Sequence, residues 1–143
     1  MKLHVLNTKN GLIPIYSVDF DEKKKLKVGN EYQVEVKKIR NPKFHRKYFA
    51  LLNMAYDNLN EKLSATYPNI DIFRKSVQVM AGYCEIAYTL DGEQIITPKS
   101  ISFAGMDETE FESLYNDVLD VLIKHVFIGM SKEFIDNELI NFM

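Results

Sequence analysis

The stretch that decides the fold is residues 41–59, NPKFHRKYFALLNMAYDNL. Asn41 is a favoured helix cap, and Pro42 suits the first helical position because its missing N–H has no partner to lose there. Apolar residues then recur at helical spacing, at Phe44, Tyr48, Leu51, Leu52, Ala55 and Leu59. We therefore expect an amphipathic helix from Asn41 to about Lys62, with this stripe packed in a core.

Further helices are predicted downstream. Asp71 is placed to cap a helix that ends or bends at Gly82. Asp107, with Glu110 three residues later, resembles a capping box and opens the longest predicted helix. Ser131 caps a last helix. The apolar C-terminal end is expected to pack on the same chain or in a dimer, because termini that are not held in place fray; it comprises Leu139, Ile140, Phe142 and Met143.

A hairpin separates these helices. Residues 83–90 and 93–103 are predicted to be strands around Asp91-Gly92, a strong two-residue turn signal. Pro98 lies in the second arm, which should therefore be bulged, broken or at a sheet edge.

Strand signals dominate the N-terminal third. Residues 2–7 alternate polar and apolar side chains, and residues 12–16 form an edge strand or extended connector that contains Pro14. Residues 19–26 are a charged helical turn or loop. Residues 31–39, EYQVEVKKI, alternate with a period of two and predict a half-buried strand. The fold class is therefore α+β, a small mostly antiparallel sheet with helices packed on one face.

Composition limits the class of protein. The 143 residues are 46% hydrophobic and 27% charged, which fits one globular domain covering residues 1–143. Cys84 is the single cysteine, so no intrachain disulfide or thiolate metal cluster can form. No apolar run approaches the roughly 20 residues of a membrane helix, and the first residues are too polar for a signal peptide. A cytoplasmic location is the default expectation.

Charge is segregated along the chain. Residues 23–47 hold ten lysines and arginines against two acids, a net charge of +8, although the whole chain carries −2. The helix that begins at Asn41 has basic residues before its cap and in its first turns, against the positive field of a helix start. A bound anion would relieve this conflict, because phosphate accepts from free N–H groups and pairs with cations. A solvated charged face with nothing bound is the alternative.

Aromatic residues alternate with these cations, as single-stranded nucleic acid requires. The predicted phosphate-binding residues are Lys37, Lys38, Arg40, Lys43, Arg46 and Lys47. The predicted stacking residues are His45, Tyr48 and Phe49, while Phe44 and Tyr48 can equally belong to the core.

Two blocks resemble a phage and prophage family of unknown function that includes the YdfU proteins. They are residues 40–53, RNPKFHRKYFALLN, and residues 100–115, SISFAGMDETEFESLY. His45-Arg46-Lys47-Tyr48 also resembles, more distantly, a helix start of the phage recombination mediator Orf (NinB), although His45 stands where that family has a polar amide. The second resemblance implies a dimeric protein that binds single-stranded DNA and helps to load a recombinase.

Catalysis has little support in the sequence. The histidines His4, His45 and His125 are far apart, no glycine-rich phosphate loop is present, and no cofactor is expected. The first hypothesis is a non-enzymatic, phage-derived accessory protein that binds nucleic acid, single-stranded DNA favoured, in recombination or replication. The alternative is a protein-interaction module that uses the basic patch and the apolar C-terminus. A metal-dependent nuclease using Asp19, Asp21 or Glu22 is the third reading.

Overall fold

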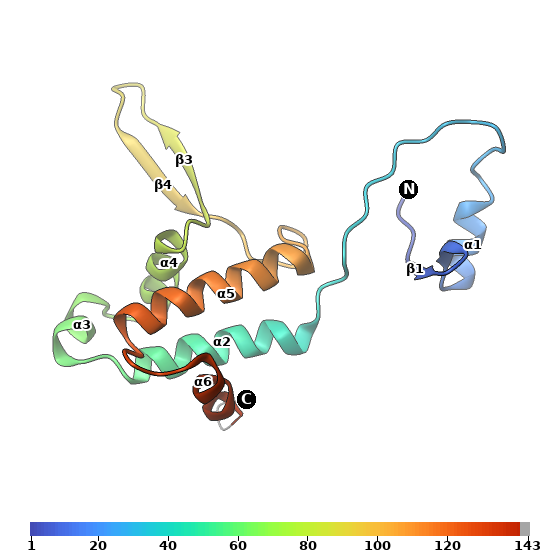
Figure 1. Ribbon diagram of the computed structural model, residues 1–143. Coiled ribbons are helices and arrows are strands. Elements are labelled where there is room, and N and C mark those ends of the chain that lie inside the picture. Colours follow the sequence, from blue (N-terminus) through green and yellow to red (C-terminus); the bar gives the residue numbers. More distant parts are fainter. Residues whose placement is uncertain (141–143) are drawn as a thin grey trace. The chain divides into compact units, whose positions relative to one another are not determined.

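The computed structural model describes residues 1–140 and divides the chain into two compact units, residues 1–36 and 37–143. The described part contains six helices and two antiparallel sheets of two strands each, so the predicted α+β class is confirmed. The strands form two separate hairpins, one in each unit, where the sequence predicted one small sheet (Figure 1).

The N-terminal unit is a hairpin followed by a short helix. Strands β1 (Val5–Thr8) and β2 (Gly11–Pro14) pair antiparallel, and α1 (Ser17–Lys23) follows. The buried carboxylate of Asp19 joins them, because it accepts from the backbone N–H of His4 at 3.0 Å and of Tyr16 at 3.3 Å. One internal anion therefore holds the start of α1 and the residue before β1 together.

The predicted strand at residues 31–39 is wrong, since these residues form neither helix nor sheet. The alternation of EYQVEVKKI is real, but Val34, Val36 and Ile39 are each at least 65% exposed. Hydrogen bonding explains the error: the carbonyl of Lys38 accepts from the N–H of Glu108 at 3.2 Å, so it meets a helix start and not a neighbouring strand. A period of two predicts extended backbone, whereas a strand also needs a partner.

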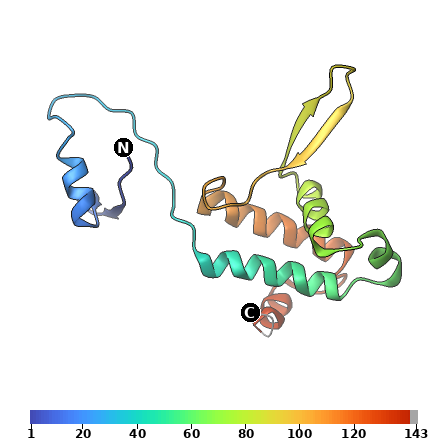
Figure 2. The same ribbon diagram turned by 180° about the vertical axis from the view of Figure 1, so that it is seen from behind.

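The C-terminal unit is built on two long helices, α2 (Pro42–Asp57) and α5 (Glu108–His125). They run side by side in both views, with α6 (Lys132–Leu139) against α2 and α4 (Ile70–Met80) against α5 (Figures 1 and 2). The predicted stripe lies in the core, where Leu51, Leu52 and Ala55 are fully buried against residues such as Phe111 and Leu114.

Local capping chemistry sets the helix ends. Asn41, Asp107 and Ser131 cap their helices as predicted. The α2 helix stops at Asp57, earlier than predicted, and the side chain of Asn60 caps a separate short helix, α3 (Glu61–Thr66). The cap of α4 is Asn69 and not Asp71, because the Asn69 side chain accepts from the N–H of Ile72 at 2.9 Å.

The hairpin of β3 (Cys84–Tyr88) and β4 (Gln94–Pro98) projects from the helices (Figures 1 and 2). Asp91-Gly92 lies in its turn as predicted, and Pro98 ends β4. The buried side chain of Gln78 on α4 fixes the base of the hairpin, because its Nε2 donates to the carbonyl of Tyr83 at 3.1 Å and of Lys99 at 2.7 Å.

Of the C-terminal residues expected to pack, only Leu139 is described within the chain's own core. Leu139 is fully buried, whereas Ile140 is 71% exposed. Phe142 and Met143, which were expected to pack with them, lie outside the described residues. Among residues 1–140, no helix has the length and apolar character needed to cross a membrane.

Candidate nucleic-acid interface

Arg40, predicted to bind phosphate, lies in the protein interior with 6% of its surface exposed. Its Nη1 donates to the carbonyl oxygens of Ile101, Ser102 and Met106 at 3.1, 3.3 and 3.1 Å. Its guanidinium carbon lies 3.7 Å from the centre of the Phe111 ring and 4.9 Å from that of Phe103. The prediction of an exposed Arg40 is corrected accordingly: this cation has its partners within the chain.

Glu108 supplies the anion that the start of α2 was predicted to lack. Its buried carboxylate accepts from the backbone N–H of Asn41 at 2.7 Å and lies 3.8 Å from Nε of Arg40. The N–H of Lys43 is taken in turn by the side chain of Asn41 at 3.0 Å. The helix start is therefore capped by its own chain, which removes the main reason for a phosphate at that point.

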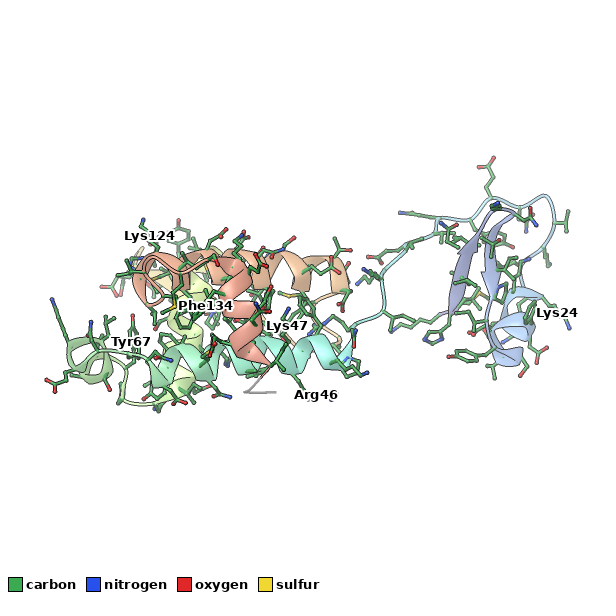
Figure 3. All side chains as sticks on the ribbon, turned by 60° about the horizontal axis from the view of Figure 1, so that its bottom comes forward. Lys24, Arg46, Lys47, Tyr67, Lys124 and Phe134 are labelled. Carbon is green, nitrogen blue, oxygen red and sulfur yellow. The ribbon has the colours of Figure 1, made fainter. Side chains whose placement is uncertain are left out.

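Three other predicted residues are also engaged. Tyr48 is fully buried beneath Phe111, so its ring is closed to a stacking base. Lys47, which is labelled in Figure 3, lies 3.4 Å from Asp136 of α6 and over the ring of Tyr115. Lys38 pairs with Glu112 at 3.0 Å, and this hydrogen bond raises the pKa of Lys38. Lys37 is exposed but is not without an interaction of its own.

The remaining predicted residues all lie on α2, where the two cations are exposed and the two rings are partly exposed. Lys43 and Arg46 are exposed, and neither makes an ion pair with any residue between 1 and 140; Figure 3 labels Arg46 on the outside of the helix. Lys43, Arg46 and Phe49 succeed one another at intervals of three, so they are neighbours on the helix surface. His45 lies beside Phe49, with ring centres 5.0 Å apart. Two cations thus adjoin two partly exposed rings.

Phe103 lies beside these residues, although it was predicted to belong to a strand. It lies in the loop before α5, is 51% exposed, and its ring centre is 5.2 Å from that of His45. The only signal in the sequence was its position in the second block of the family resemblance. We call the five residues Lys43, His45, Arg46, Phe49 and Phe103 the outer α2 surface.

His45 is held as a neutral ring. Nη2 of Arg40 lies 2.7 Å from Nδ1 of His45, and because a guanidinium can only donate, Nδ1 is the acceptor. Burial lowers the pKa of His45, and the nearby charge of Arg40 lowers it further. The ring is therefore uncharged at neutral pH, and it stacks on the ring of Phe111 with the ring centres 5.5 Å apart.

The carboxylates considered for a nuclease do not converge. Asp19 is buried and occupied by backbone N–H groups, while Asp21 and Glu22 pair with Lys24 and Lys25. Within residues 1–140, no three His, Cys, Asp or Glu side chains are grouped closely enough to hold a metal ion.

Fold and surface thus define an α+β protein of two compact units with exposed cations and partly exposed aromatic rings on one helix. The chain belongs to the family described as "Protein of unknown function (DUF1367)", whose matches cover residues 1–70 and 58–141. This confirms the expected membership of a family of unknown function. No curated protein and no solved structure matched the chain.

Proposed function

We propose that this protein is a non-enzymatic, phage-derived accessory protein that binds single-stranded nucleic acid, DNA favoured, through the outer α2 surface in recombination or replication. The carrying observation is that Lys43 and Arg46, which have no carboxylate partner within residues 1–140, lie on the same helix as His45 and Phe49, and that His45 in turn contacts the exposed ring of Phe103. Cations suit the phosphate backbone, and rings suit unpaired bases irrespective of sequence.

Fewer residues are available to a nucleic acid than the sequence predicted, since Arg40, Lys38, Lys47 and Tyr48 have other partners or lie in the core. What supports nucleic acid is the alternation that remains on the surface. A solvated helix face accounts for Lys43 and Arg46, whereas the half-exposed ring of Phe103, which contacts His45, is a surface that an unpaired base would cover.

Phage origin is supported by the two blocks that resemble the family of the YdfU proteins. Those blocks meet in space, because Arg40 of the first donates to Ile101, Ser102 and Met106 of the second. Several residues that carry the resemblance therefore have a structural role, because they pack around Arg40. The likeness to Orf (NinB) bears on the surface itself, since Arg46 of that motif is exposed.

A protein-interaction module is the second candidate, and the β3–β4 hairpin favours it. Ile86 and Ile96 pair across the strands and are 55% and 50% exposed, and Tyr88 on the same face is 66% exposed. A two-stranded sheet with an open apolar face is a plausible surface for a recombination or replication protein or a second copy of this chain.

Binding of labelled single-stranded DNA, duplex DNA and RNA, measured over a range of salt concentrations, tests the proposal. Neutralising Lys43 and Arg46 to glutamine should weaken single-strand binding and reduce the log–log salt slope by about 1.4, at roughly 0.7 per phosphate contact. The matched control is Lys62→Gln with Lys124→Gln, which removes two exposed cations elsewhere in the same unit. If both pairs of substitutions change the slope equally, the outer α2 surface is not the binding site.

A further inference from the structure

The N-terminal unit has a shallow hollow lined by cations and aromatic rings. It lies between the end of α1 and the turn that follows, and its lining includes Phe20, Lys23, Lys24, Lys27 and Tyr32. We call these five residues the N-terminal hollow. No acidic residue lines it. Figure 3 labels Lys24 on this unit.

The lysines of the hollow are largely uncommitted. Within residues 1–140, Lys23 and Lys27 make no ion pair. Lys24 lies 3.7 Å from Asp21, but both side chains are at least 75% exposed, and such a pair contributes little. Lysines at the end of a helix are ordinary by themselves, because they face its negative pole. These lysines indicate a binding surface only because exposed aromatic rings lie beside them.

Phe20 and Tyr32 are 45% and 48% exposed. The hydroxyl of Tyr32 accepts from the backbone N–H of Lys27 at 2.9 Å, which anchors the ring across the turn. That turn spans residues 27–30, closed by the N–H of Asn30 donating to the carbonyl of Lys27 at 3.3 Å. Gly29 has a φ of +88°, a conformation that a residue with a side chain rarely adopts. The fold thus holds an aromatic ring open to solvent beside free lysines.

We infer that the N-terminal hollow is a second contact surface for the same single-stranded nucleic acid, so that one strand binds both units of the chain. This inference rests on the proposed function of the outer α2 surface. The lysines contact phosphates, and Phe20 and Tyr32 offer faces to unpaired bases. Residues 31–40 join the two surfaces covalently, and joined sites bind one long ligand more tightly than either site alone.

The length of the oligonucleotide probe distinguishes binding to one surface from binding to both surfaces. We compare a thymidine oligonucleotide of about 6 nucleotides, suited to one surface, with one of about 30, long enough for both. Lys23→Gln with Lys27→Gln should reduce affinity for the long probe by about ten-fold or more and lower its salt slope by about 1.4. Affinity for the short probe should change by less than about three-fold, since the outer α2 surface still binds it.

The matched control is Lys2→Gln with Lys9→Gln, which removes the same charge from exposed positions of the same unit outside the hollow. NMR of the unsubstituted protein provides a readout that needs no variant to fold: the long probe should shift the backbone amides of Lys27 and Tyr32.

Three outcomes are distinguishable. If the hollow variant matches its control and the amide shifts are confined to residues 37–140, the second surface is refuted while the proposed function stands. If neither the Lys43 and Arg46 variant nor the Lys23 and Lys27 variant differs from its control in affinity for single strands, the proposed function and this inference are both refuted. The same holds if the unsubstituted protein binds no single-stranded DNA. Loss of long-probe binding in the hollow variant alone, with the short probe retained, supports both.

Discussion

At the scale of single residues, Arg40 marks the difference between a basic residue in the sequence and a basic site on the surface. Its side chain joins the loop before α5 to the start of α2 through three carbonyls and Glu108. We expect Arg40→Lys to lower the free energy of unfolding by about 2–3 kcal/mol, because an ammonium cannot reproduce the planar fork and leaves buried carbonyls unpaired. Urea denaturation measures this loss.

The control for Arg40 is Arg46→Lys, which makes the same chemical change at an exposed position of α2. Its denaturation midpoint should equal that of the unsubstituted protein. Equal midpoints for both variants would mean that Arg40 does not hold the core together.

His45 gives the C-terminal unit a dependence on pH. Its pKa in the folded protein is lowered by burial and by Arg40, whereas in the unfolded chain it returns to about 6.5. Below that pH the unfolded chain binds more protons, so the contribution of His45 to stability is complete above about pH 6.5 and is lost as the pH falls. Urea denaturation at several pH values should show a weaker dependence in His45→Gln, and an unchanged dependence would contradict this assignment.

At the scale of elements, the features that could be predicted from the sequence are those that depend on residues close together in the chain. The start of α2 follows from Asn41 and Pro42, and its core stripe follows from the 3.6-residue period, because both depend on residues within a few positions of each other. The buried place of Arg40 could not be predicted in this way. Its partners stand sixty or more residues further along the chain, and only the packed helices bring them together.

The same distinction explains the segment at residues 31–39. Its alternating pattern is a local property, but strand formation depends on a partner elsewhere, and the hydrogen bond of Lys38 goes to the start of α5. The exposed Phe103 is the reverse case: no local pattern separates an aromatic ring in a core from one on a surface loop. The sequence thus predicted that the candidate site contains cations and aromatic rings. It could not predict which of these side chains remain exposed in the fold.

At the scale of the whole molecule, the two compact units raise the question of whether residues 1–143 unfold as the single domain predicted from length. Limited trypsin digestion followed by mass spectrometry addresses it. We expect the first cuts after lysines between residues 23 and 38, which lie in exposed backbone at the end of α1 and beyond. Arg40, only two residues past this stretch, should resist cleavage because it is buried.

A fragment beginning near Ile39 should therefore accumulate, since cleavage inside α2 or α5 requires those helices to open. Digestion in urea provides the control, because Arg40 and Lys47 should then be cut as fast as the exposed lysines. Equal early cutting at Arg40 and at Lys27 under native conditions would contradict the buried position of Arg40. If cuts between residues 23 and 38 appear only when α2 is also cut, the chain unfolds as one domain. If they precede it, residues 37–140 hold their structure without an intact N-terminal unit, and the outer α2 surface belongs to a part that is stable by itself.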